Sequence, residues 1–344
     1  MLTATFVLLQ NGLYIDAITT QNIKIKQLYI KWNEKIDVSL QEISINKNNS
    51  SKSSKFEYKN IDNYLKSLSR SSDLFSSVTV EKIKFNDVSA SFKYREGEDG
   101  FLMASSPLFK LESSLNIKRN FLNMRITTLK YLKRNIQLSG DMYFNFKDIV
   151  VYGNINVDVN SDVNANLFLA IDEERLIYKL KNNKNIKSIN YLINTLNLPK
   201  EVKFWALDAI DMDYLSVENV SGFIDFNKSN QILKNIKVKA TVHSLNYTYN
   251  KKLDAIHAKT TELELKNGVF YIYPKNAYSY GTYLNKSWIK IDFTKKEETL
   301  TLQLLFDGML NKDTLKILNA YKIKLPFLQN SGTVATNLTL NIGL

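Results

Sequence analysis

The sequence contains no cysteine and only two histidines, His243 and His257. Disulfide frameworks, thiolate metal sites and cysteine nucleophiles are therefore excluded, and two imidazoles are too few for most histidine-based metal sites. Glycine and proline are also scarce, with 11 and 4 residues among 344, so collagen-like and linker-rich chains are excluded. What remains is a chain that must be held together by an apolar core or lining.

Apolar residues make up 44% of the sequence, which is far more than disordered chains contain. The formal net charge is +12, a balance that suits nucleic acid or an anionic lipid surface. The charge is carried mostly by lysines that alternate with apolar residues along the chain, whereas nucleic-acid modules gather basic residues in patches. This distribution favours a solvated polar face, and we expect no nucleic-acid partner.

Alternation of apolar and polar residues is the dominant pattern. Alternation with a period of two places one residue set on each face of a strand and is typical of antiparallel sheets with one covered face. The runs follow one another too closely for the crossover helices of a parallel sheet. The sequence therefore predicts a mainly β, antiparallel fold. The runs lie at 23–26, 36–40, 88–94, 111–118, 136–146, 155–159, 163–171, 236–242, 245–249, 263–265, 269–273, 300–306 and 334–342.

Turns and a few short helices interrupt the alternation. Asn267-Gly268 and Glu98-Asp99-Gly100 each join two alternating runs, and Asn and Gly tolerate the positive φ of tight hairpins. Apolar residues at helical spacing predict helices near residues 58–75, 186–210 and 312–321.

The second and third of these helical segments are similar, because both end in Leu-Pro and both are followed by a Ser-Gly before strands resume. This similarity indicates a repeat of a helix followed by a β-meander.

The first nine residues are apolar but too few to span a membrane, so they are either the remnant of an anchor or a short buried strand or helix end. The last strand stops within its run, which suggests that the sheet continues further. The predicted organisation has four parts: an anchor remnant at 1–12, a β-rich unit at 13–185, a helix pair with a β-meander at 186–311, and the start of a truncated repeat at 312–344.

The sequence offers no catalytic motif. It contains no nucleophile elbow, no dinucleotide-binding glycine motif and no phosphate-binding loop. His243 and His257 both lie in strands, and the acidic clusters lie at turns or at strand-ladder spacing without the spacing of a calcium loop. We therefore expect a protein that is not an enzyme, with no metal and no cofactor.

Residues 240–282 form a characteristic phrase: an alternating strand, the apolar dipeptide Ala255-Ile256, a second strand, Asn267-Gly268, a third strand and Tyr280-Gly281. The stretch 198–226, with Leu198-Pro199, Trp205 and a restarting strand, has the same character. In both, the chain resembles the AsmA-like family, and within it the YhdP-type repeating β-groove proteins. The resemblance covers most of the chain.

The resemblance implies a long, twisted, groove-forming sheet in an inner-membrane-anchored protein whose bulk lies in the periplasm of a Gram-negative bacterium. It implies phospholipid transport between the inner and outer membranes and a role in envelope integrity. The implied partners are phospholipid acyl chains, the inner membrane through the N-terminus, and outer-membrane or periplasmic proteins. An alternative is a non-catalytic scaffold of the cell envelope with a closed β core, since a closed sandwich shows the same alternation.

An apolar trough would be lined by the inward residues of the central and C-terminal strands. Aromatic residues favour strands in any case, so their abundance alone does not indicate a lining. The predicted lining residues are Phe144, Phe146, Tyr247, Tyr249, Leu263, Leu265, Tyr271, Leu302 and Leu304.

Overall fold

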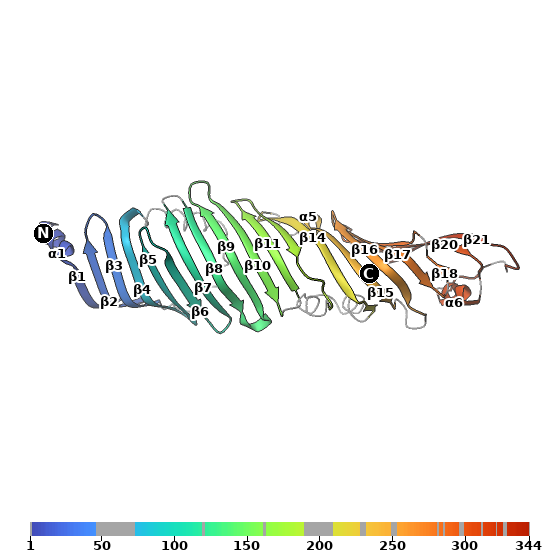
Figure 1. Ribbon diagram of the computed structural model, residues 1–344, viewed down its shortest axis with the longest axis horizontal. Coiled ribbons are helices and arrows are strands. Elements are labelled where there is room, and N and C mark those ends of the chain that lie inside the picture. The colour runs from blue at the N-terminus through green and yellow to red at the C-terminus, as the bar shows by residue number, and fades with distance from the viewer. Residues whose placement is uncertain are drawn as a thin grey trace. The chain divides into compact units, whose positions relative to one another are not determined.

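The computed structural model of the 344-residue chain is mainly β and divides into two compact units, residues 1–178 (unit 1) and residues 179–344 (unit 2) (Figure 1). The structure describes residues 2–45, 73–118, 121–160, 163–188, 209–227, 232–248, 253–280, 282–284, 286–295, 299–310, 312–320, 322–325 and 329–343.

Unit 1 is an open, twisted sheet whose strands follow one another in chain order, from blue to green in Figure 1. Each strand pairs with the strand before it in the sequence, as short connections favour. Its elements are α1 (Leu2–Asn11), β1 (Leu13–Thr19), β2 (Ile23–Trp32), β3 (Ile36–Ile45), β4 (Phe75–Phe85), β5 (Val88–Arg95), β6 (Gly100–Ser105), β7 (Phe109–Lys118), β8 (Phe121–Tyr131), the 3₁₀ turn η1 (Leu132–Arg134), β9 (Ile136–Asn145), β10 (Val150–Val159) and β11 (Val163–Ile171), and β12 (Arg175–Asn182) crosses into unit 2.

Unit 2 is built in the same way, and all its described strand pairs are antiparallel. β17 pairs with both β16 and β19, and β21 pairs with β20. Its elements are β13 (Ile210–Asp211), β14 (Tyr214–Asp225), α5 (Ile232–Asn235), β15 (Lys237–Tyr247), β16 (Ile256–Lys266), β17 (Val269–Ser279), β18 (Thr282–Tyr283), β19 (Trp288–Asp292), β20 (Thr299–Gly308), α6 (Lys312–Ala320) and β21 (Val334–Gly343).

One pair in unit 1 departs from the antiparallel pattern. β3 and β4 run parallel, with Val38 opposite Val78 and Ile43 opposite Ile83. Parallel neighbours cannot be joined by a tight hairpin, and residues 46–74 connect these two strands. The alternating runs in the sequence do not reveal this reversal of direction, because the side-chain period is the same in both kinds of sheet.

The predicted helices have different outcomes. The helix predicted at residues 312–321 is confirmed as α6. The prediction at 58–75 falls almost entirely outside the described residues, and Phe75 begins β4. The prediction at 186–210 is wrong at its ends, because Ile186 forms a β-bridge with Leu215 and Ile210 begins β13; residues 189–208 lie outside the described part. Two further helical elements, α5 and η1, lie outside the segments for which the sequence predicts helices.

The apolar N-terminal run forms α1, which ends at Asn11. Gly12 follows with φ +93 and donates its N–H to the carbonyl of Leu9 at 3.3 Å, a common glycine ending for a helix. Tyr29 packs so closely there that a Cβ on Gly12 would lie 2.4 Å from the tyrosine Oη. Within the described residues, no helix has the length and apolar character needed to cross a membrane.

The predicted Asn267-Gly268 hairpin is confirmed. It joins β16 to β17, with Lys266 opposite Val269, and both turn residues have positive φ, +53 and +74. This connection sets the register between two central strands of unit 2, and a shift of one residue would exchange their faces.

In unit 2, the alternation of side chains between the two faces shifts by one residue at the same level of three neighbouring strands. Ser244 and Asn276 have positive φ, and Lys259 lies between them in the register of β15, β16 and β17. As a result, Val242 and Leu245, three positions apart, lie buried on the same face. Strict alternation along one strand would place these two residues on opposite faces.

A charged cluster on the polar face of unit 1 gives a pH-dependent stability. Glu42 on β3 accepts from Lys84 at 2.9 Å and Lys26 at 3.2 Å, and these ammonium groups lower the pKa of Glu42 from 4.5 to about 2. A carboxylate with a lowered pKa stabilises the fold above its unfolded pKa and loses that effect as the pH falls through the folded value.

We therefore expect Glu42→Gln to lower the thermal midpoint slightly at pH 7, with the difference from wild type shrinking between about pH 4.5 and pH 2. Thermal melts followed by circular dichroism across this range measure the effect. Glu112→Gln removes an exposed carboxylate on β7 and serves as the control. A constant difference between wild type and Glu42→Gln at all pH values would contradict the assignment.

Candidate functional site

One face of unit 2 carries apolar rows that run across the strands. Residues directly opposite each other in a sheet share a face, so the register defines each row. With about 4.8 Å between strands, a row from β15 to β21 extends roughly 24 Å. The first row is Ala240, Leu263, Ile272, Ile289, Leu302 and Leu340, and the second is Val238, Leu265, Phe270, Ile291 and Leu300.

Unit 1 has the same construction over more strands. A row from β2 to β11 extends roughly 43 Å at about 4.8 Å per strand. Every position in it is apolar, although the residues come from ten separate segments of the sequence. The row consists of Ile25, Ile43, Ile83, Ala90, Ala104, Leu111, Leu129, Leu138, Val157 and Ala165.

These rows are only partly shielded from solvent. In the unit 1 row, Ala165 is the only buried member, and in the first unit 2 row it is Ala240; the others are half-buried. Two apolar sheets packed face to face would bury such residues on both sides. Within each described unit, the apolar face is therefore a surface with a half-open lining.

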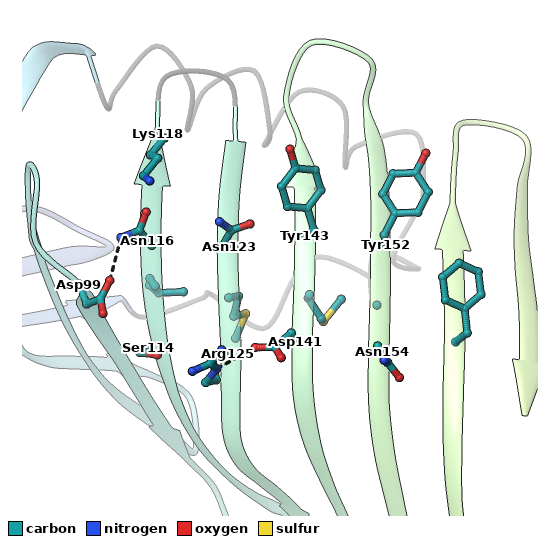
Figure 2. A pocket seen from close by; sticks show the side chains of 15 residues that line it. Asp99, Ser114, Asn116, Lys118, Asn123, Arg125, Asp141, Tyr143, Tyr152 and Asn154 are labelled. Carbon is teal, nitrogen blue, oxygen red and sulfur yellow. Dashed lines mark hydrogen bonds and ion pairs between the residues drawn. The ribbon is translucent and has the colours of Figure 1, made fainter. Parts of the chain in front are cut away.

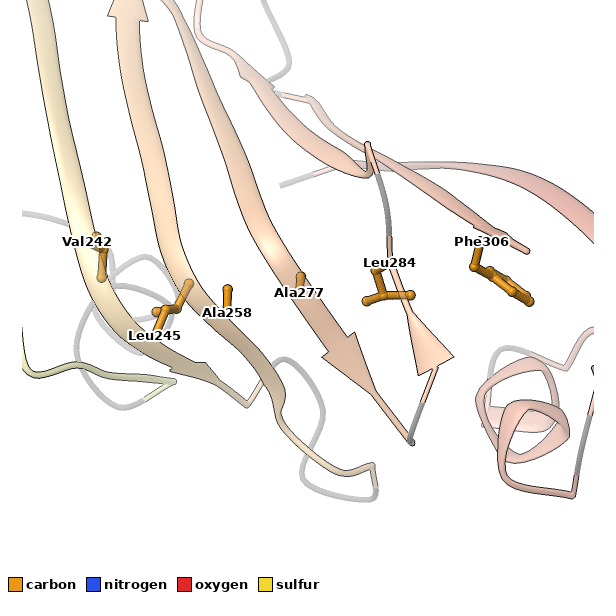
Figure 3. Packing of buried hydrophobic residues seen from close by; sticks show 6 residues of the cluster. All are labelled: Val242, Leu245, Ala258, Ala277, Leu284 and Phe306. Atoms are coloured by element: carbon orange, nitrogen blue, oxygen red, sulfur yellow. The ribbon is translucent and has the colours of Figure 1, made fainter. Parts of the chain in front are cut away.

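Clusters of buried apolar residues occupy limited parts of each face. In unit 2 the cluster includes Val242, Leu245, Ala258, Ala277, Leu284 and Phe306 (Figure 3). These residues lie on β15, β16 and β17, directly after β18, and on β20. In unit 1 a smaller cluster consists of Leu115, Leu122 and Phe146. These clusters anchor the sheets, whereas the rows beside them remain accessible.

Most of the predicted lining residues lie on these apolar faces. Phe146 belongs to the unit 1 cluster and Phe144 packs against it. In unit 2, Leu263, Leu265 and Leu302 belong to the two rows, Leu304 faces the same way opposite Leu338, and Tyr247 packs against the buried cluster. Tyr249 lies outside the described residues.

The placement of Tyr271 in the lining is wrong. Tyr271 is opposite Glu264 and Lys290 on the polar face, its ring stacks 5.8 Å from that of Tyr273, and Lys266 lies 5.6 Å from its centre. In β17 both faces carry large apolar or aromatic residues, because Phe270 and Ile272 alternate with the two tyrosines. Sequence alternation therefore could not identify the inner set, and the pairing with β16 decides it.

A few polar side chains interrupt the apolar faces. Ser113 is buried in unit 1 and donates to the carbonyl of Leu102 at 3.1 Å. Thr261 and Ser279 are buried in unit 2, and their hydroxyls have no hydrogen-bond partner within the described structure. Burial also raises the pKa of Tyr94, which lies opposite Val78 in unit 1.

The two histidines lie on the polar face of unit 2. His243 stacks on Tyr214 at 4.2 Å, and His257 stacks on Tyr278 at 5.0 Å and contacts Asn246 through Nδ1. The described residues contain no group of three or more histidine or acidic side chains that could hold a metal ion. The arrangement is that of aromatic and polar pairs along a sheet ladder.

Sequence reasoning missed the lining residues of unit 1 between β2 and β8. The alternating run at residues 36–40 and that at 88–94 indicated which residues share a face of one strand. Nothing in the sequence indicated that Ile43 would lie opposite Ile83, because β3 and β4 are joined by a long connection and run parallel; Ala90 then joins the same row through the β4–β5 hairpin. The signal lies in the register alone.

Comparison of the chain with protein-family models, with curated proteins and with solved structures gives no match.

Proposed function

We propose that the apolar faces of the two units bind the acyl chains of lipids, and that the protein serves phospholipid transport between two membranes. The observation that carries this proposal is the unbroken transverse rows of half-buried apolar residues. The resemblance to the AsmA-like family supports the same function and adds an inner-membrane anchor and a periplasmic location to the proposal.

The physical reason is the cost of exposing an acyl chain to water. Burial of one methylene is worth about 0.8 kcal/mol, so a lipid chain crossing water unprotected meets a barrier on the order of 10 kcal/mol. A row of Leu, Ile and Val side chains lowers that barrier along its whole length. Hydrophobic contact has no directional requirement, so a chain can slide from one strand to the next without a reacting residue.

The backbone of such a surface suits this task. Within the described strands, the sheet hydrogen bonds occupy the backbone groups, so an acyl chain on the apolar face meets side chains rather than unpaired amides. Within the described strands, the apolar rows contain no lysine. Lys239 and Lys290, for example, lie on the polar face, opposite Glu264 and Tyr271. The polar face keeps the sheet in water while the other face holds lipid.

We expect the purified chain to carry phospholipid. Extraction with organic solvent followed by mass spectrometry should recover phospholipid from the wild type at a fixed molar ratio. Leu302→Asp should reduce the amount, and Lys290→Asp, a charge change on the polar face of the neighbouring strand, should not. Lipid-free protein that still folds would contradict the proposal and favour an envelope scaffold.

A further inference from the structure

The polar face of unit 1 contains a groove of about 650 Å³, formed by β7 to β11 (Figure 2). Its floor follows the backbone of one register row, in which Leu115, Met124 and Met142 lead to Gly153. Leu115 and Met124 belong to the apolar packing of unit 1. Their side chains therefore point away from the groove, and the groove is separate from the apolar rows.

Two parallel walls flank this floor, because neighbouring rows on either side point to the polar face. The first wall is Asn116, Asn123, Tyr143 and Tyr152, each opposite the next across the sheet. Figure 2 shows the two tyrosine rings side by side on β9 and β10. The ring centres of Tyr143 and Tyr152 are 6.5 Å apart, and Phe121 stacks on Tyr143 at 5.3 Å.

The second wall carries an ion pair. It consists of Ser114, Arg125, Asp141, Asn154 and Phe168. Arg125 donates through Nε to Asp141 at 2.8 Å, and both side chains remain largely exposed, 73% and 65%. Phe168 is 46% exposed and Tyr152 44%, so aromatic surface faces solvent beside these polar groups.

The polar groups of the groove indicate the chemistry of a ligand. Two cations, Lys118 and Arg125, are balanced by two carboxylates, Asp99 and Asp141, so the groove has no net charge to attract an ion. Arginine and lysine only donate hydrogen bonds, carboxylates only accept them, and asparagine does both. A phosphate or carboxylate ligand could use only the donors, whereas a hydroxyl group donates and accepts and can use the whole set.

The aromatic rings complete the match. A sugar ring has a face of C–H groups, which packs on an aromatic ring, and an edge of hydroxyl groups, which needs mixed donors and acceptors. Tyr143, Tyr152 and Phe168 provide the rings, and the amide and charged groups belong to the same lining. Cross-strand aromatic pairs also stabilise sheets, but that role does not require a hollow between exposed rings and an exposed ion pair.

We propose that this groove binds a neutral glycan, with sugar rings against the aromatic wall residues and hydroxyl groups hydrogen-bonded to Arg125, Asp141 and the asparagines. The glycan chain runs across the strands, parallel to the walls. This site is independent of acyl-chain binding, because its walls project from the other face of the sheet.

The test uses the purified full chain and neutral hexasaccharides of glucose, mannose and N-acetylglucosamine, with a sulfated hexasaccharide as the anionic probe. Calorimetry and saturation-transfer NMR measure binding at low and high salt. We expect at least one neutral probe to bind with an affinity that salt changes little, because its contacts are uncharged on the ligand side. Tyr152→Ala should weaken that binding about tenfold, and Tyr152→Phe should retain most of it.

The matched control is Tyr14→Ala, which removes a similarly exposed tyrosine (55%) from the polar face of β1, outside the groove. It should leave glycan binding unchanged. Circular dichroism melts of all variants separate lost binding from lost fold, and Arg125→Ala gives a second variant should Tyr152→Ala unfold. Preference for the sulfated probe, absence of binding by every neutral probe, or equal binding by Tyr152→Ala would each overturn the proposal.

Discussion

Leu265→Asp should leave unit 2 folded and interrupt acyl-chain binding at β16, whereas Leu245→Asp should unfold the unit. Leu265 is half-buried on the apolar face between Val238 and Phe270, so a carboxylate there can stay hydrated. Leu245 is only 8% exposed within the cluster of Figure 3. An unpaired carboxylate at that position costs on the order of 3–5 kcal/mol, which is comparable with the stability of a small domain.

The measurement combines thermal melts with photo-crosslinking of a lipid probe placed on either side of β16. The Leu265→Asp protein should melt close to the wild type but lose crosslinks on one side of the substitution. Glu264→Ala changes the neighbouring residue on the polar face and should alter neither property. Unfolding of both aspartate variants would mean that the apolar face is a closed core, and undiminished crosslinking in a folded Leu265→Asp protein would exclude lipid passage.

Gly140→Ala should destabilise unit 1 strongly. Gly140 lies on β9 opposite Ile126 and Ile155, with φ +144, a backbone conformation that residues with a Cβ rarely adopt. A Cβ there would lie 2.2 Å from the backbone oxygen of Asn154 and 2.9 Å from the Cα of Ile155. Because these are backbone atoms of a paired strand, the neighbour cannot rotate away, and we expect a loss of about 3 kcal/mol or more in the free energy of unfolding.

Urea unfolding followed by circular dichroism measures this loss. Gly97→Ala is the matched control, since Gly97 also has positive φ, +79, but nothing lies within 4 Å of its Cβ position. That substitution should lower the free energy of unfolding by about 1 kcal/mol, because only the unfavourable positive φ of the backbone contributes. Equal costs at the two positions would mean that the close approach of β10 to Gly140 does not contribute.

Much of the fold could be predicted from single strands. The alternating runs at 136–146 and 163–171 became β9 and β11, and Asn267-Gly268 became the hairpin between β16 and β17. The candidate site was predictable to a smaller extent. Leucines such as Leu263 and Leu302 could be identified as lining residues because the residues on either side of them in the sequence are polar. Tyr271 could not be placed correctly, because its strand is apolar or aromatic on both faces.

The sequence by itself determined that the chain forms β-strands with an apolar and a polar side, because side-chain alternation is a local property of the backbone. Only the tertiary structure decided which strands are neighbours, including the parallel pair β3–β4, and which residues meet across them. The apolar rows and the polar groove both depend on that register. Register results from pairing between segments that are distant in the chain and from local departures from regular strand conformation, such as the positive φ of Ser244. Neither can be recognised from the side-chain pattern of a single strand.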